Sequence, residues 1–240
     1  MTDMEKRALD VLCSFGDTPC YEQMKQSLLR GEAEVLMVED TCVLTRHRLE
    51  RFCMLAGEET RMREMAKLVP ADAREVLVHG VLTDEAVEGF KNILGMTDVE
   101  PYVMYGYYGE MPPEETQAQI RPLTAEDLDF VYENYGHASR GYLDMLLKKG
   151  VMIGAYVDGA LAGFIGEHAA GAMGLLHVMP EFRRHHLGFA LERADIRRIL
   201  LSGSTPFCQV AIANTPSHNL QERLGLTRAE GRMYWMSRAE

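Results

Sequence analysis

The stretch GLLHVMPEFRRHHLGFALERA, residues 174 to 194, constrains the fold of this chain more than any other. An apolar run ends at Pro180, four basic or titratable residues follow, and Leu187, Leu191 and Ala194 then recur at helical spacing. This order predicts a strand that ends at the proline and turns directly into an amphipathic helix. The first backbone N–H groups of such a helix lack partners and lie at the positive end of its dipole, so the sequence predicts an anion site there.

The residues of this turn suit a pyrophosphate. Gly188 would let a phosphate approach the backbone closely, and Arg183 and Arg184 can add charge-assisted hydrogen bonds. The alternative is a solvated helix start, which is the commoner role of an isolated arginine pair. His185 and His186 do not indicate a metal site, because adjacent residues point to different sides of a helix.

The second half of the chain alternates helices and strands in a regular order. In sequence, the predicted elements are a helix capped by Thr124, a hairpin that turns at Asp158-Gly159, a strand at 175–179, a helix after Arg183, a buried strand that ends at Asn214, a short helix closed by Gly225 and a last strand at 232–237.

The first half repeats this order in weaker form. EVLMVEDTCVLTR resembles the hairpin, REVLVHG the buried strand, EGFKNILGM the short helix and VEPYVMYGYY the closing strand, whereas AGEETRMREMAKLV has no counterpart to PEFRRHHLG. A tandem duplication with one degenerate half and a pair of unrelated α/β halves both agree with this pattern. The prolines and polar residues of GEMPPEETQAQ indicate a linker, so we expect lobes at 1–110 and 120–240 joined by a linker at 111–119.

Two motifs in the second half resemble the GNAT superfamily of acyl-CoA-dependent N-acyltransferases. The turn from Arg183 to Gly188 follows its strand as the family's Arg/Gln-x-x-Gly-x-Gly/Ala loop does, and Asn214, Ser217 and LQERLGL follow a later strand with the family's spacing. The resemblance covers residues 120–240 well and the first half faintly. It implies an α/β fold in which a mixed, splayed central sheet is flanked by helices in the C-terminal half, preceded by a degenerate GNAT-like α/β lobe.

The resemblance also implies how acetyl-CoA, or another acyl-CoA, would bind. The pantetheine arm would pair like a strand with the backbone around Leu176 and Val178, and the motif of Asn214 and Ser217 would contact it from the later strand. The residues implied for the pyrophosphate are Arg183, Arg184, His185, His186, Leu187, Gly188 and Phe189. Two departures from the family pattern stand out: His186 replaces its first glycine, and Gln221 replaces a tyrosine that protonates the departing thiolate in many members.

A base is expected as well, because the attacking amine has to lose a proton. Glu167 is our choice, since it follows the strand next to the one that carries Val178, and His168 and His177 are the other candidates. His177 precedes Val178 by one residue, so on a regular strand it faces the opposite side. Some family members supply a base from the positions that Ala172 and Gly174 occupy in this chain.

Composition excludes several classes of function. The formal net charge of −11 would repel a nucleic-acid backbone, and no apolar run approaches the ~18 residues that span a bilayer. The first residues do not have the pattern of a signal peptide, and the five cysteines lack CxxC spacing. We therefore expect a cytoplasmic protein without nucleic-acid, membrane or metal partners.

The sequence thus predicts an N-acetyltransferase that moves an acetyl or other short acyl group from acyl-CoA to the amine of a small molecule. A negatively charged protein would attract a cationic acceptor, which agrees with an amine. The alternative is a GNAT-derived module that binds or senses acyl-CoA without turnover, which His186, Gln221 and the missing base at positions 172 and 174 favour.

Overall fold

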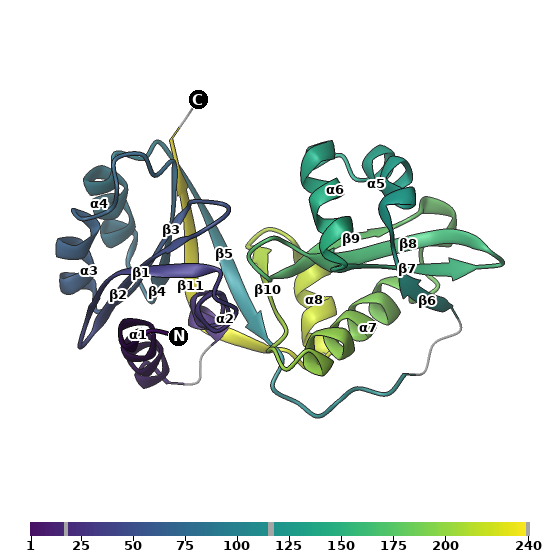
Figure 1. Ribbon diagram of the computed structural model, residues 1–240, viewed down its shortest axis with the longest axis horizontal. Helices are drawn as coiled ribbons and strands as arrows, with labels where there is room; N and C mark the ends of the chain where they lie inside the picture. Colours follow the sequence, from purple (N-terminus) through teal and green to yellow (C-terminus); the bar gives the residue numbers. More distant parts are fainter. Residues whose placement is uncertain (17–18, 115–117, 239–240) are drawn as a thin grey trace. The chain divides into compact units, whose positions relative to one another are not determined.

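The computed structural model describes residues 1–16, 19–114 and 118–238, and its elements are labelled in Figure 1. They form two compact units. Unit 1 comprises Met1–Gly106, Gln209–Glu222 and Leu226–Glu240, and unit 2 comprises Tyr107–Cys208 and Arg223–Gly225. The units do not follow the two halves of the sequence, because the segments after residue 208 are divided between them. The lobe boundaries expected at 1–110, 111–119 and 120–240 stay a prediction about the sequence repeat.

Unit 1 is built around a mixed sheet. Its elements before residue 107 are α1 (Asp3–Ser14), a 3₁₀ turn (Pro19–Tyr21), α2 (Glu22–Leu29), β1 (Ala33–Glu39), β2 (Cys42–His47), β3 (Cys53–Gly57), α3 (Glu59–Ala66), β4 (Glu75–Gly80), α4 (Asp84–Leu94) and β5 (Asp98–Gly106). Met62 of α3 and Phe90 of α4 pack against Leu44 and Val78, so these helices cover one face of the sheet. The Thr83 side chain accepts a hydrogen bond from Ala86 N, and this bond fixes the start of α4.

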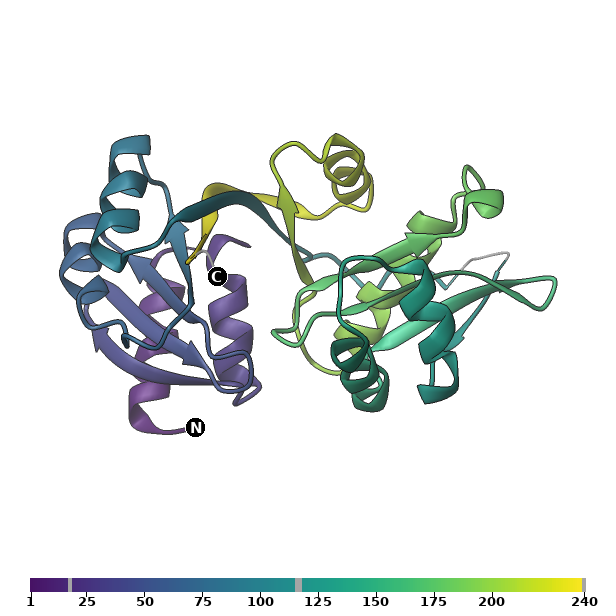
Figure 2. The same cartoon turned by 90° about the horizontal axis from the view of Figure 1, so that it is seen from above.

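The last strand of the chain lies inside the sheet of unit 1. After β10 (Phe207–Ala211) and α8 (Thr215–Arg223), β11 (Thr227–Ser237) pairs antiparallel with β4 on one side and with β5 on the other (Figure 2). The strand order is β1-β2-β3-β4-β11-β5-β10. The sheet of the first half therefore obtains one of its internal strands from the end of the sequence.

Unit 2 is a four-stranded sheet with helices on both faces. Its elements are β6 (Gln119–Pro122), a 3₁₀ turn (Ala125–Asp127), α5 (Leu128–Asn134), α6 (Arg140–Lys149), β7 (Met152–Val157), β8 (Ala160–Glu167), β9 (Met173–Val178), a second 3₁₀ turn (Pro180–Phe182) and α7 (Leu187–Leu201). The sheet order is β6-β7-β8-β9, with α5 and α6 on one face and α7 on the other (Figure 1).

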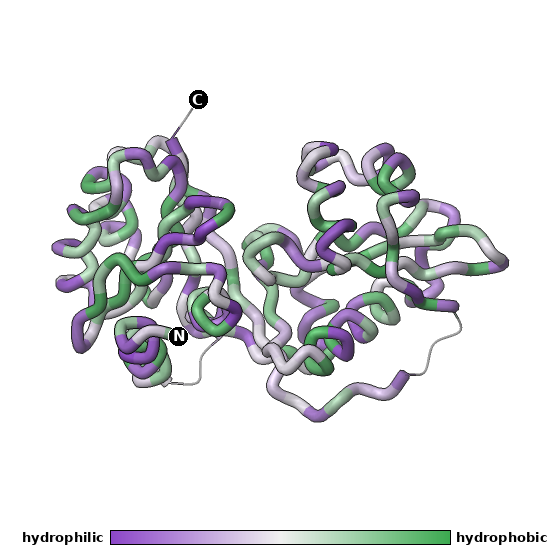
Figure 3. Tube along the Cα trace, viewed as in Figure 1, coloured by the Kyte–Doolittle hydropathy of each residue, from purple (hydrophilic) through white to green (hydrophobic). Residues whose placement is uncertain are grey.

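Alternating side chains of β8 and β9 supply the two cores of unit 2. Phe164 and Leu175 pack toward α5 and α6, whereas Ile165 and Leu176 pack toward α7. Because both faces are covered, β7 and β8 are buried along most of their length, and their stretches are largely apolar in Figure 3. The β7–β8 hairpin turns at Asp158 and Gly159, which both have positive φ, as the sequence predicted.

Within the described ranges, no helix is long and apolar enough to cross a lipid bilayer.

Candidate active site

The turn between β9 and α7 brings most of the predicted cofactor residues together. β9 ends at Val178, the 3₁₀ turn follows, and α7 begins at Leu187. Arg183 Nε donates a hydrogen bond of 3.0 Å to Val178 O, which fastens the turn to the end of the strand. Arg184, His185 and His186 are exposed. The turn therefore presents three basic or titratable side chains to solvent beside the first turn of the helix.

Left-handed backbone is concentrated at this site. Among the described non-glycine residues, five have a left-handed φ, and three of these are Leu175 (57°), Arg184 (66°) and His186 (57°). His186 is the N-cap of α7 and makes no side-chain capping bond, so no side chain of the cap covers the first N–H groups of the helix. A turn that alternates left-handed and other conformations points successive N–H groups into one concavity, which is an anion-binding arrangement.

The outer edge of β9 is not paired with another strand of the described residues. In the sheet of described residues β9 is an edge strand, paired with β8. Phe164 pairs with His177 and Gly166 with Gly174, so Leu175 and Leu176 together face Ile165 and form a β-bulge. Unpaired strand edges can pair with extended chains through backbone hydrogen bonds.

Gly188 connects the helix start to the same strand. A Cβ built at Gly188 would lie 3.7 Å from Leu176 Cδ2 and 3.9 Å from Val178 Cγ2, which are ordinary contact distances. Leu176 and Val178 therefore direct their side chains toward α7, and their backbone lies at the sheet edge. The guanidinium carbons of Arg193 and Arg223 lie 5.7 and 5.5 Å from the ring centre of Phe189, the next residue.

Glu167, the base chosen from the sequence, lies in a buried ion pair. Its side chain is 6% exposed, and its Oε1 lies 2.9 Å from Arg198 Nη2. Arg198 also pairs with Asp195, which is fully buried, and burial raises the pKa of Asp195 to about 6 although Arg198 opposes the shift. Glu167 pairs with Met173, at the end of β9 opposite to Val178. Arg198 holds this carboxylate on the α7 side, so it is poorly placed to take a proton from an amine. The geometry therefore argues against Glu167 as the base, and its role stays a prediction.

The two candidate histidines lie on the other side of the sheet. The His177 ring stacks on Phe164 at 5.5 Å, which confirms that it faces away from Val178. Burial, and secondarily the charge of Arg183, lowers the pKa of His177. His168 is partly exposed in the turn after β8, and its Nδ1 lies 3.3 Å from the Tyr142 hydroxyl. Burial lowers the pKa of His168 as well.

Comparisons with known proteins agree on one fold. Residues 151–236 match the family model of FR47-like proteins, and a search of curated proteins gives no significant match. A Drosophila protein of solved structure aligns with a TM-score of 0.63 at 19% identity, over 98% of this chain and 95% of its own. A GCN5-related N-acetyltransferase from Kribbella flavida aligns with a TM-score of 0.60 at 11% identity, over 94% and 97%. A tandem GNAT protein from the clavulanic acid biosynthesis pathway aligns with a TM-score of 0.50 at 16% identity, over 98% and 94%.

The fold is that of the GNAT superfamily. This confirms the predicted fold class, a mixed and splayed sheet flanked by helices with a GNAT-like lobe before the C-terminal half. The β9–α7 turn carries the residues that resemble the GNAT loop, with His186 in the place of its first glycine. Its φ of 57° is a conformation that glycine adopts without strain, so the backbone conformation explains why a glycine suits this position.

The residues that resemble the second GNAT motif lie in unit 1. Asn214 Oδ1 accepts a hydrogen bond of 3.2 Å from Ser217 N, so this side chain caps the start of α8. Gln221, in the place of the family's tyrosine, is 3% exposed. The contribution of Asn214 and Ser217 to cofactor binding stays a prediction.

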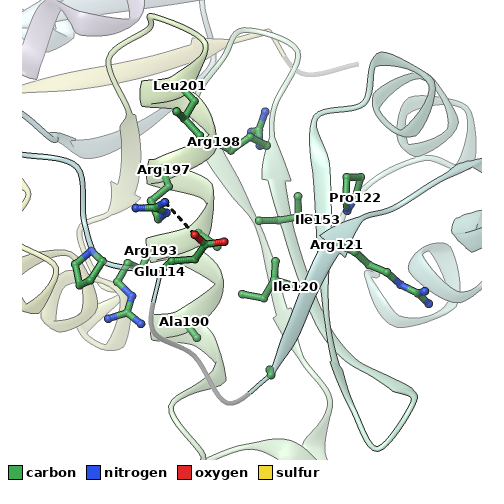
Figure 4. Close-up of a pocket in the computed structure, with 13 residues that line it drawn as sticks. Glu114, Ile120, Arg121, Pro122, Ile153, Ala190, Arg193, Arg197, Arg198 and Leu201 are labelled. Carbon is green, nitrogen blue, oxygen red and sulfur yellow. Dashed lines mark hydrogen bonds and ion pairs between the residues drawn. The ribbon is translucent and has the colours of Figure 1, made fainter.

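A cavity of about 520 Å³ lies on another flank of α7, between this helix and β6 (Figure 4). It contains none of the predicted cofactor residues. Its cationic side chains have partners: Arg197 pairs with Glu114, Arg198 with Glu167, and Arg121 lies 3.8 Å above the Tyr156 ring. Arg197 and Arg198 therefore connect α7 to the preceding segment and to β8, whereas Arg121 packs within the sheet.

Sequence reasoning did not identify three features of the site. The bulge at Leu175 has no signal, because leucine has no preference for left-handed backbone. The ion pair of Arg198 with Asp195 at i, i+3 was detectable as a helical pair, but not its burial. Tyr142 contacts His168, which is 26 residues away in the sequence, and no local pattern predicts a contact over this separation.

Proposed function

We propose that this chain is an N-acyltransferase that moves an acetyl or other short acyl group from acyl-CoA to the amine of a small molecule. The observation that carries the proposal is the β9–α7 connection, where an unpaired strand edge leads into a helix start with no side-chain cap and arginines beside it. The edge suits the amide groups of a pantetheine arm, and the helix start suits its pyrophosphate.

The residues present fit such a cofactor. Arg184 and the N–H groups at the start of α7 would hold the pyrophosphate, and the backbone of Leu176 and Val178 would pair with the arm. When bound, the cofactor supplies an activated thioester. The acceptor follows from chemistry and charge: a thioester is attacked readily by a neutral amine, and a net charge of −11 attracts the ammonium form from solution.

One observation favours a binding protein without turnover. Gln221 cannot donate a proton as an acid, so a departing thiolate would have to obtain its proton elsewhere. Turnover with any amine separates the two functions.

Coenzyme A binding tests the proposed site directly. Coenzyme A at ~100 times its dissociation constant should raise the free energy of unfolding by roughly 2.7 kcal/mol, observed as a higher melting temperature. Gly188→Asp should abolish this rise, because it adds a negative charge to the first turn of α7, beside Leu176 and Val178, where it opposes an anion at the same helix start. Gly188→Ala is the matched control, since its Cβ fits at contact distance and it should keep the rise. An unchanged melting temperature of the parent protein at millimolar coenzyme A would refute the proposal.

A further inference from the structure

The imidazole of His168 covers the backbone of Gly174. The turn that carries it is closed by two hydrogen bonds of 2.8 Å, from His168 N to Ala172 O and from Gly171 N to His168 O. A Cβ built at Gly174 would lie 2.5 Å from His168 Nε2, which is too close for any side chain. The absent side chain at position 174 therefore makes room for the ring, and Nε2 lies beside β9 one residue before the bulge.

Tyr142 of α6 orients this ring. Its hydroxyl oxygen accepts a hydrogen bond of 3.0 Å from Ala169 N and lies 3.3 Å from His168 Nδ1. A phenol oxygen has two lone pairs, so it can accept from Nδ1–H as well as from Ala169 N–H. The base role described below requires this arrangement, in which the neutral ring donates Nδ1–H to the Tyr142 oxygen and keeps a lone pair on Nε2. Within the described residues Nε2 makes no hydrogen bond.

The position along β9 distinguishes His168 from His177. A phosphopantetheine arm is about as long as four or five residues of extended chain, roughly 15 Å. Val178 is the end of β9 next to the proposed pyrophosphate site, and four residues back along the strand is Gly174. An arm along this edge would bring its sulfur beside Gly174 and the His168 ring, whereas His177 would lie beside the middle of the arm.

We propose that His168 is the general base of the acyl transfer and that Tyr142 is its positioning residue. The proposal rests on the proposed function. The amine nitrogen forms a bond with the thioester carbonyl carbon, the carbon–sulfur bond breaks, and the proton of the nitrogen moves to His168 Nε2. The thiolate of coenzyme A then takes this proton, which restores the neutral ring and gives an amide and a free thiol. One imidazole thus serves as base and acid, so no acid is needed at position 221.

The surroundings of His168 support this role. Burial lowers its pKa, so the ring is neutral at pH 7 and can accept a proton. The polar groups that face the turn from α6 are the Tyr142 hydroxyl and the Lys149 ammonium, which donates a hydrogen bond of 3.4 Å to Ala169 O. Glu167 of β8 points to the α7 side, where Arg198 holds it. None of the described partners of this turn is a carboxylate, which would stabilise the charged His168 ring and raise its pKa.

Two substitutions at different positions test the proposal. His168→Gln removes the base, and Gly174→Ala leaves the histidine in the sequence but displaces its ring from the edge of β9. Both should lower turnover of acetyl-CoA with small primary amines such as tyramine and putrescine by something like 10²-fold, and both should keep the melting shift with coenzyme A. His177→Gln is the control and should retain turnover. Tyr142→Phe should leave coenzyme A binding unchanged and move the acidic limb of the pH profile to lower pH, because the oxygen that stabilises the charged ring is lost.

Nitrogen NMR of the imidazole gives a second measurement that does not depend on an acceptor. The His168 resonance, assigned by its loss in His168→Gln, should show the proton on Nδ1 and a pKa below that of a free histidine. A proton on Nε2 would overturn the proposal, as would parental turnover in His168→Gln. The proposed function fails separately, if the parent protein shows no melting shift with coenzyme A.

Discussion

At the scale of single residues, backbone strain at His186 marks the start of α7. A non-glycine residue in the left-handed region costs roughly 1–2 kcal/mol relative to right-handed backbone, and glycine avoids most of this cost. His186 has φ 57° and no hydrogen bond from its side chain to the helix, so nothing at the cap offsets the strain. The chain thus keeps a side chain where the GNAT motif has none, at the point where a pyrophosphate would approach the backbone.

His186→Gly should therefore raise both stability and cofactor affinity. We expect the free energy of unfolding to rise by up to about 1 kcal/mol, and the dissociation constant of coenzyme A to fall several-fold. Thermal unfolding and calorimetry measure the two effects. His185→Gly is the matched control: His185 is exposed and outside the left-handed region, so the same change there should lower stability. An equal loss of stability in both variants would show that the backbone strain at His186 does not contribute to the free energy of unfolding.

At the scale of elements, β11 holds unit 1 together. Its residues Arg232–Ser237 pair with β4 and β5 at once, so a break in this strand exposes two strand edges and the core packed beneath them. Tyr234 and Met236 of β11 belong to that core, together with Cys42 and Cys53. Burial raises the pKa of Cys42 to about 12 and that of Cys53 to about 11. A thiol that is buried and has a raised pKa is unreactive.

Tyr234→Pro should make these thiols reactive. Proline removes a ladder hydrogen bond from a strand that is paired on both sides, so it should destabilise the sheet. Of the five cysteines, Cys13 is exposed, so the parent protein should react rapidly at one thiol, whereas the variant should also react at Cys20, Cys42 and Cys53. Glu230→Pro, in the interrupted register between Arg228 and Arg232, should change labelling much less. Labelling of Tyr234→Pro at one thiol would contradict the role given to β11.

The elements that were predicted from the sequence are those with local signals. The Asp158-Gly159 turn, the Thr124 cap and Gly225 at the end of α8 each depend on residues that are neighbours in the chain. The place of β11 depends on pairing with strands more than 100 residues away, and no local pattern encodes it. For the same reason the sequence located the β9–α7 turn but not the contact between Tyr142 and His168, which joins α6 to the turn after β8.

At the scale of the whole molecule, the two GNAT-like halves differ at the helix start that would hold a phosphate. In unit 1 the corresponding helix is α3, in the stretch where the sequence showed no loop motif. The Glu58 N–H donates a hydrogen bond of 2.9 Å to Thr41 O, and a Cβ at Gly57 would lie 2.2 Å from the same oxygen. A backbone carbonyl thus occupies the place beside α3 that the turn before α7 leaves to solvent.

Acidic side chains reinforce this difference, so we expect one molecule of coenzyme A per chain. Glu58 and Glu59 stand at the start of α3, where their charge would repel a phosphate, whereas Arg183 and Arg184 precede α7. Isothermal titration calorimetry should give a stoichiometry of one. Gly188→Asp should then abolish all binding, because the substitution removes the single site in unit 2 and unit 1 offers no other. Two sites of similar affinity, or a remaining stoichiometry of one in Gly188→Asp, would show that the first half has kept a functional loop despite its acids.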